Sequence, residues 1–597
     1  MREPDHHAAV VLDGGSLTLR DLARLARDPR VRIENHPDAH ARVEASRAQI
    51  ERLVERYVEE WGKGDEGSPV LEYGVTTGFG EFKNIPVAPD QLQQLQRNLL
   101  LSHSAGAGLT ADPDNPANYY EPDVVRAVLA VRLNAFLKGY SGVRPDLVRT
   151  VQAMLNRGIV PRVPIHGSVG SSGDLCPLSH LFVVLLGEGS WFLVREPADL
   201  GHRPREIRRG LRPLEEDLGM PPVQPSYKEG LALNNGTTFS TALLALAVHD
   251  AEAAADTADV ACALSLEAVC GSARAFDARV HEARGQAGQI AVAAHLRELL
   301  RGSRLLEAAG AVQDVYSLRC APAVHGAARD AIAYARRVAE MEINAATDNP
   351  LFFPADETPP WDWEFRDNWP EGYRGDQRAG YSAGNFHGEP VGMAADFLAI
   401  GVAELANISE RRIQMLLDER QSRNLPANLI PCRGVNSGFM LAQYTAAGLV
   451  SENKVLTHPA SVDSIPTSAN AEDHNAMSTI AARKLRTVLR NVQAVLAIEL
   501  LAAAQGVEWR VGMGIDPRTN GKAKPASEWE GAVREGRDFE DATRPERRAG
   551  IADRLGAGTR RAWLWVRELA PPMLTDRTLD GDILAVRAAV EAHLFVV

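Results

Sequence analysis

The chain has 597 residues, of which 45% are hydrophobic, and its formal net charge is −13 with a sequence pI of about 5.7. This length and apolar content suffice for one large helical unit with its own core. The acidic balance argues against nucleic-acid binding, which requires a basic face. The five cysteines show no C-x-x-C spacing, so we expect neither a metal site nor disulfides, and a reducing cytoplasm fits. We also expect no signal peptide and no membrane span, because no charge-free apolar run reaches about 18 residues.

Short elements are predicted near the N-terminus. Val10–Leu12 has the composition of a short strand, and Thr18 and Asp21 have the spacing of a capping box that opens a helix. The glycines at 62–67 match G-x-G-x-x-G by letter, but they follow a helix and precede no βαβ unit, so we interpret them as a helix-ending loop. The helix before them is predicted from apolar residues at helical spacing, namely Ile50, Leu53, Val54, Tyr57, Val58 and Trp61.

Loops and helices then alternate. Tyr73–Gly80 is a glycine-rich loop, and residues 91–101 are predicted to form a helix that residues 102–108 break. Residues 124–136 predict a further apolar helix. Residues 190–225 are rich in proline and arginine, and we interpret them as a loop region with little core.

From residue 228 onward the composition is typical of a large helix bundle, because Ala, Leu, Glu and Arg dominate long segments. A Pro-, Asp- and Trp-rich stretch at 354–380 interrupts them and is too long for a simple connection. We therefore divide the chain into an N-terminal part (1–225), a central long-helix bundle (226–510) and a C-terminal helical region (511–597). The long segments are 237–270, 321–347, 389–423, 438–456 and 475–505.

The most informative stretch is Ser171-Ser172-Gly173. Because glycine has no Cβ, the backbone can fold tightly there, and the Gly173 nitrogen can attack the Ser171 carbonyl carbon. Loss of water closes a five-membered ring, and loss of a second water from Ser172 leaves an exocyclic methylene, which is an electrophile. Asp174 is placed to cap the following helix, whose positive end would lie beside the ring. For the tetrapeptide alone, the alternative is an ordinary capped turn.

The longer pattern at 167–180, Gly-Ser-Val-Gly-x-Ser-Gly-Asp-Leu-x-Pro-Leu-x-His, resembles the signature of the aromatic amino acid lyases, the histidine, phenylalanine and tyrosine ammonia-lyases. In that family the tripeptide cyclises to 4-methylidene-imidazol-5-one (MIO), although its first residue is usually Ala rather than Ser171. The resemblance implies a mainly α fold, with a large elongated helix bundle of the lyase and fumarase type and a smaller mixed N-terminal part. It also implies a homotetramer with shared active sites. Further blocks in the family order are 228–237, 276–286, 313–320, 384–390 and 435–440.

The resemblance assigns roles to individual residues. Removal of ammonia requires a base for a non-acidic β-proton, and this role falls on Tyr73. A phenol is a poor base at its ordinary pKa of about 10, so the pKa of Tyr73 has to be lowered, and we expect nearby helix ends to lower it. Without the family, Tyr73 would be interpreted as a loop aromatic packed against Phe79. Asn235 is expected to contact the ring oxygen and the substrate, and Phe386 is expected to pack beside the ring.

A second group follows further along the chain. Arg319 is expected to bind the substrate carboxylate, because a guanidinium group matches a carboxylate bidentately. Tyr316 and Gln313 precede it at a spacing that would let all three face one pocket from a helical turn. An ordinary polar helix face is the alternative.

Substrate choice rests on His103 and Glu472. His103 falls where histidine-specific members carry His, although some tyrosine-acting members do so too. Glu472 matches a Glu of the histidine enzymes, where other members tend to have amides. A carboxylate can accept a hydrogen bond from imidazole, whereas a phenyl ring would leave it unpaired. The alternative for Glu472 is an acid at a helix start. Thr76 argues mildly for another substrate, since histidine enzymes often have Asn in that loop.

The leading hypothesis is an ammonia-lyase that converts L-histidine to trans-urocanate. A tyrosine or other aromatic lyase, or a 2,3-aminomutase, is the alternative, because each uses the same electrophile. A non-catalytic helical scaffold is a third hypothesis, and serine hydrolysis and nucleotide chemistry are disfavoured because no G-x-S-x-G elbow and no G-x-x-x-x-G-K-[ST] loop is found. The scaffold hypothesis is disfavoured by the presence of Tyr73, Ser172, Gly173, Asn235 and Arg319.

Overall fold

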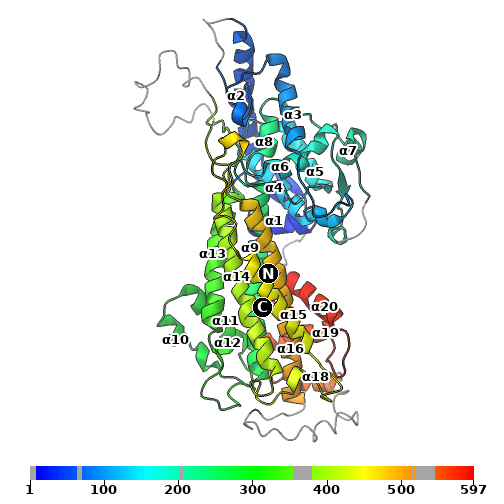
Figure 1. Cartoon of the computed structure of the whole chain (residues 1–597), viewed down its shortest axis with the longest axis vertical. Coiled ribbons are helices and arrows are strands. Elements are labelled where there is room, and N and C mark those ends of the chain that lie inside the picture. Colours follow the sequence, from blue (N-terminus) through cyan, green and yellow to red (C-terminus); the bar gives the residue numbers. More distant parts are fainter. Residues whose placement is uncertain are drawn as a thin grey trace. The chain divides into compact units, whose positions relative to one another are not determined.

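The computed structural model describes residues 9–63, 70–201, 206–353, 379–512, 517 and 545–596, and Figure 1 shows its helices. The predicted mainly α fold is confirmed, because helices dominate these residues and the strands among them are few and short. The predicted glycine loop after residue 63, most of the interruption at 354–380 and most of the charged stretch after residue 512 lie outside the described residues.

Contacts divide the chain into two compact units. Unit 1 comprises Met1–Leu246, Arg336–Ala395 and Pro459–Arg483, and unit 2 comprises Ala247–Ala335, Asp396–His458 and Lys484–Val597. Four of the five boundaries fall within long helices, which therefore belong partly to each unit. These helices are α9 (Thr238–Ala268), α13 (Ala321–Glu342), α14 (Glu389–Leu417) and α16 (Ser478–Gly512).

Unit 1 contains all four described strands, which form two separate pairs. Strand β1 runs parallel to β2, and β3 runs antiparallel to β4. Thr18 caps α1 as predicted, because its hydroxyl oxygen accepts a hydrogen bond from the Asp21 N–H at 3.1 Å. The elements are β1 (Val10–Leu12), α1 (Leu19–Arg27), β2 (Ile33–Asn35), α2 (Pro37–Glu60), α3 (Leu92–His103), α4 (Pro122–Leu137), α5 (Pro145–Asn156), β3 (Ile159–Pro161), α6 (Leu175–Phe182), β4 (Trp191–Leu193), α7 (Leu211–Leu218) and α8 (Glu229–Asn234).

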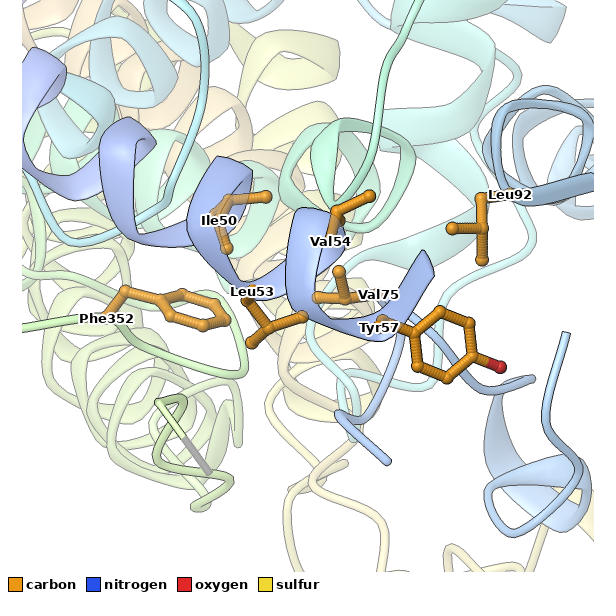
Figure 2. Close-up of a cluster of buried hydrophobic side chains, with 7 residues drawn as sticks. All are labelled: Ile50, Leu53, Val54, Tyr57, Val75, Leu92 and Phe352. Atoms are coloured by element: carbon orange, nitrogen blue, oxygen red, sulfur yellow. The ribbon is translucent and has the colours of Figure 1, made fainter. Parts of the chain in front are cut away.

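Helix α2 contributes one side of a hydrophobic cluster in unit 1, drawn in Figure 2. Most of its predicted apolar face is buried, but Val58 is 49% exposed and Trp61 is 38% exposed. Val58 directly follows Tyr57, and adjacent residues lie about 100° apart around a helix, so Val58 turns away from the cluster. The cluster consists of Ile50, Leu53, Val54, Tyr57, Val75, Leu92 and Phe352.

Two regions differ from the prediction. Helix α3 continues to His103, so the predicted break begins only at Ser104. The region 190–225 was expected to hold little core, and this expectation is wrong, because it contains β4 and α7. Trp191 is fully buried there, and its indole Nε1 donates a hydrogen bond to Asp217 at 2.8 Å.

Unit 2 is helical throughout its described elements. Glu499 on α16 pairs with Arg412 on α14, and both side chains are fully buried. Helices α14 and α16 are long and apolar enough to cross a membrane, but 61% and 83% of their apolar windows are buried inside the protein. The other helices are α10 (Ala278–Glu282), α11 (Ala287–Leu299), α12 (Tyr316–Arg319), α15 (Met440–Leu456), α18 (Pro545–Ala552), α19 (Ala557–Leu569) and α20 (Asp580–Glu591).

Candidate active site

The segment Ser171-Ser172-Gly173 forms a tight bend just before α6 in unit 1. Gly173 has a φ of +70°, and an added Cβ would lie 2.1 Å from the Gly236 carbonyl carbon, so a side chain at this position would collide with the backbone. An isolated β-bridge joins Gly173 to Gly236, and the Asp174 N–H donates to the Gly236 carbonyl oxygen at 2.8 Å. The Gly236 backbone therefore holds the bend in place.

Two N–H donors converge on the Ser172 carbonyl oxygen. The Asn235 side-chain Nδ2 donates at 2.8 Å, and the Gly236 backbone N–H donates at 3.2 Å. Asn235 is the C-cap residue of α8 and is only 4% exposed, so its side chain is held in this orientation. Negative charge that develops on the Ser172 oxygen would be stabilised by both donors. The sequence pointed to Asn235 but not to Gly236, because an Asn-Gly pair is also an ordinary turn signal.

Asp174 is the N-cap residue of α6, as predicted, but its side chain makes no capping hydrogen bond to that helix. Its Oδ2 accepts a hydrogen bond from the Ser240 N–H at 2.9 Å, near the start of α9. Its Oδ1 accepts from the Ser168 hydroxyl at 2.9 Å and from the Thr479 hydroxyl. Burial raises the pKa of this carboxyl, and the hydrogen bonds oppose that rise. Asp174 thus ties the bend to the N-terminal ends of α9 and α16.

Glu472 lies beside the tripeptide. The Ser172 hydroxyl donates a hydrogen bond to the Glu472 carboxylate, which also accepts one from the Thr467 hydroxyl at 2.6 Å. An isolated β-bridge joins the backbones of Thr467 and Glu472. Helix α16 begins only at Ser478, so Glu472 is not an acid in the first turn of a helix. The carboxylate predicted to select the substrate therefore contacts the serine predicted to become the electrophile.

Tyr73 packs against Phe79, with ring centroids 6.4 Å apart and ring planes at 90°, as the alternative interpretation expected. Its hydroxyl oxygen accepts a hydrogen bond from the Gly80 N–H at 3.4 Å. Burial raises the pKa of Tyr73, the Gly80 hydrogen bond opposes that rise, and the negative charge of Glu472 adds a smaller rise. The expected lowering by helix ends is thus not what the described residues produce.

His103 and Phe386 both belong to unit 1. His103 is the last residue of α3, and its Nδ1 lies 3.0 Å from the Ser102 hydroxyl oxygen. Burial lowers the pKa of the His103 imidazole, while the nearby Glu472 charge acts in the opposite direction. Phe386 is half-buried in a segment whose Gly388 N–H donates to the carbonyl oxygen that precedes Ser171 in the chain, at 2.9 Å.

The remaining predicted residues belong to unit 2. Tyr316 and Arg319 lie on the one-turn helix α12, and the guanidinium carbon of Arg319 is 4.6 Å from the centroid of the Tyr316 ring. Tyr316 is 71% exposed, and the Nε of Arg319 is buried without a hydrogen-bond partner. Gln313 lies before the helix begins and is exposed, so it does not share the helical face that the spacing predicted.

Comparisons with known proteins identify the family of this chain. The model of the aromatic amino acid lyase family matches residues 17–533. The histidine ammonia-lyase of Caldanaerobacter subterraneus subsp. tengcongensis is 43% identical over 578 residues, which cover 96% of this chain and 95% of that protein. Histidine ammonia-lyase from Trypanosoma cruzi, known from a crystal structure, is 37% identical in sequence with a TM-score of 0.77. The match covers 98% of this chain and 94% of that chain. Tyrosine aminomutase from Streptomyces globisporus is 33% identical with a TM-score of 0.78 and covers 98% of both chains. The chain therefore belongs to the aromatic amino acid lyase family.

Proposed function

We propose that this protein is a carbon–nitrogen lyase that eliminates ammonia from L-histidine and releases trans-urocanate. The observation that carries the proposal is the hydrogen bond from the Ser172 hydroxyl to the Glu472 carboxylate. It brings an acceptor suited to an imidazole N–H next to the predicted reactive centre. Relatives named histidine ammonia-lyase, which match nearly the whole chain, support the same substrate.

We infer that Ser171, Ser172 and Gly173 form MIO, and the residues present fit that group. The bend at Gly173 excludes a side chain, and the Ser172 carbonyl, which would become the ring carbonyl, has two N–H donors. The Ser171 side chain lies outside the ring, and its hydroxyl is buried without a hydrogen-bond partner. A Ser in place of Ala therefore adds no bond that opposes cyclisation. When formed, MIO supplies an electrophilic methylidene carbon for the substrate amine.

The protein groups then have separable tasks. Asn235 and the Gly236 N–H hold the Ser172 carbonyl and withdraw electron density from it. Glu472 accepts the imidazole N–H, and Tyr73 takes the β-proton. Arg319 binds the substrate carboxylate, which would give its unpaired Nε a partner.

We propose that the protein is a cytoplasmic homotetramer in which neighbouring copies complete each other's sites. The exposed side chains of Tyr316 and Gln313 support this, because they are free to meet a substrate held by another copy. The substrate-binding roles of His103 and Phe386 remain part of the same proposal.

A tyrosine lyase or a 2,3-aminomutase is the second candidate, favoured by the 33% identity to tyrosine aminomutase. The sequence at Thr76 mildly favoured a substrate other than histidine, but the position of Thr76 in the structure does not support this second candidate. Thr76 is fully buried, and its hydroxyl oxygen accepts a hydrogen bond from the Glu72 N–H at 2.8 Å. Its side chain therefore serves the loop that carries Tyr73.

Two measurements test the proposal. Intact-mass spectrometry of the purified chain should give a mass lower than the sequence by two water molecules, and incubation with L-histidine should produce urocanate absorbance. A full-mass chain without activity would favour the scaffold hypothesis. Turnover of L-tyrosine alone would replace the substrate, and recovery of a β-amino acid would identify an aminomutase.

A further inference from the structure

Arg132 is a buried cation on α4, with 1% of its surface exposed, and it is absent from the predicted site residues. Its Nη2 donates to the Asn235 carbonyl oxygen at 2.6 Å and also to the Ala232 carbonyl oxygen. Its Nη1 donates to the Thr238 hydroxyl at 3.3 Å. Burial lowers the pKa of Arg132 to about 10, which leaves the guanidinium charged at neutral pH.

No carboxylate among the described residues is within ion-pair distance of Arg132. Asp348, a buried acid whose charge raises the pKa of Arg132, pairs instead with Lys228 at 2.8 Å. Arg132 therefore donates its hydrogen bonds to backbone carbonyl oxygens and to the Thr238 hydroxyl, while the charges of Asp348 and Asp174 raise its pKa without a direct ion pair. A buried charge without a direct ion pair acts strongly on the groups that it contacts, because little water screens it.

The carbonyl that Arg132 contacts belongs to the peptide group between Asn235 and Gly236. The N–H of that same peptide group donates to the Ser172 carbonyl oxygen at 3.2 Å. A cation on the oxygen of an amide polarises the whole amide and makes its N–H a stronger donor, because linked hydrogen bonds reinforce one another. The guanidinium of Arg132, one peptide group and the Ser172 oxygen thus form a continuous chain of donors and acceptors.

We propose that Arg132 is a positioning residue that increases the electrophilicity of the group formed from residues 171–173 by polarising the Asn235–Gly236 peptide. This inference rests on the proposed function. The same polarisation makes the Cα proton of Ser172 more acidic, because it withdraws density from the adjacent carbonyl. Arg132 therefore also assists the loss of water from Ser172. In that step the Cα–H and Cβ–Oγ bonds of Ser172 break, a Cα=Cβ double bond forms, and the proton and the hydroxyl leave as water.

Arg126 provides a matched control on the same helix. It is fully buried, its guanidinium donates to the Leu25 carbonyl oxygen at 2.7 Å and to that of Ala26 at 3.2 Å, and burial lowers its pKa to about 10 as well. Both acceptors belong to α1 rather than to the site. Replacement of Arg126 therefore removes a similar buried cation from α4 without a link to Ser172.

The experiment compares the full chain with Arg132→Met, Arg132→Lys and Arg126→Met. Intact mass reports water loss, the absorption maximum of MIO reports its polarisation, and the rate of reduction by borohydride reports its electrophilicity without substrate. We expect Arg132→Met to lower both kcat for L-histidine and the rate of borohydride reduction by about 10- to 100-fold. This loss does not exceed the loss in kcat that follows removal of one complete oxyanion-hole donor. Its KM should change little, and its absorption maximum should move to shorter wavelength.

Arg132→Lys should recover part of each effect, because it keeps the charge. Arg126→Met should match the full chain in mass, spectrum and kcat, even where its thermal stability falls as far as that of Arg132→Met. Failure of Arg132→Met alone to lose its two waters, with recovery in Arg132→Lys, would support the same role. An unchanged spectrum and borohydride rate in Arg132→Met, or an equal loss in Arg126→Met, would overturn it. A wild-type chain that retains both waters would instead overturn the proposed function, and this inference with it.

Discussion

Asn235→Ala is expected to slow the reaction strongly while leaving the protein folded. The change removes the shorter of the two hydrogen bonds to the Ser172 carbonyl oxygen, at 2.8 Å, and keeps the Gly236 N–H at 3.2 Å. Loss of one donor from an oxyanion-type site costs about 10²- to 10³-fold in kcat, or about 3–4 kcal/mol. Because the second donor remains, we expect a loss of about 10²-fold. The stability cost should be small, about 1 kcal/mol for one hydrogen bond.

The assay is kcat for L-histidine, measured as urocanate formation, together with thermal unfolding and intact mass. Asn234→Ala is the control, because Asn234 is the adjacent residue and is fully buried. Its Nδ2 donates to the Ser179 hydroxyl at 3.1 Å, not to the tripeptide. Equal losses of kcat in the two variants would refute the reasoning, since the effect would then come from general loosening of the end of α8.

Three further predictions concern the bend, the substrate and pH. Gly173→Ala should give a chain of full mass, because its Cβ would lie 2.1 Å from Gly236; a mass lower by two waters would contradict this. Glu472→Gln should reduce turnover of L-histidine far more than any activity on L-tyrosine or L-phenylalanine, and equal reductions would remove Glu472 from substrate selection. Burial lowers the pKa of His180 to about 4, and the Gly106 N–H donates to its Nε2 at 2.9 Å, so the folded chain holds the neutral imidazole. The unfolded chain binds the extra proton below about pH 6.5, so urea unfolding should show full stability above that pH and a loss of about 3 kcal/mol as pH falls to about 4. A His180→Gln variant with the same pH dependence would contradict that assignment.

Local signals predicted the parts of the structure that depend on neighbouring residues. Thr18 caps α1 over three residues, and the apolar face of α2 follows from its own period. Local signals did not predict the partners of the Asp174 side chain, because Ser240 is 66 residues away and belongs to another helix. The core of 190–225 likewise depends on the pairing of Trp191 with Asp217, which a composition rich in proline and arginine conceals.

The direction of the pKa shift of Tyr73 was also not predictable from local sequence. It depends on burial and on Glu472, which is distant in the chain. Burial and the Glu472 charge both raise that pKa, so the site without substrate disfavours the phenolate. A substrate whose imidazole N–H donates a hydrogen bond to the Glu472 carboxylate would weaken the effect of that charge on Tyr73. On the proposed function, binding of the histidine imidazole at Glu472 therefore also weakens one of the two causes that raise the pKa of Tyr73, while burial remains the larger cause.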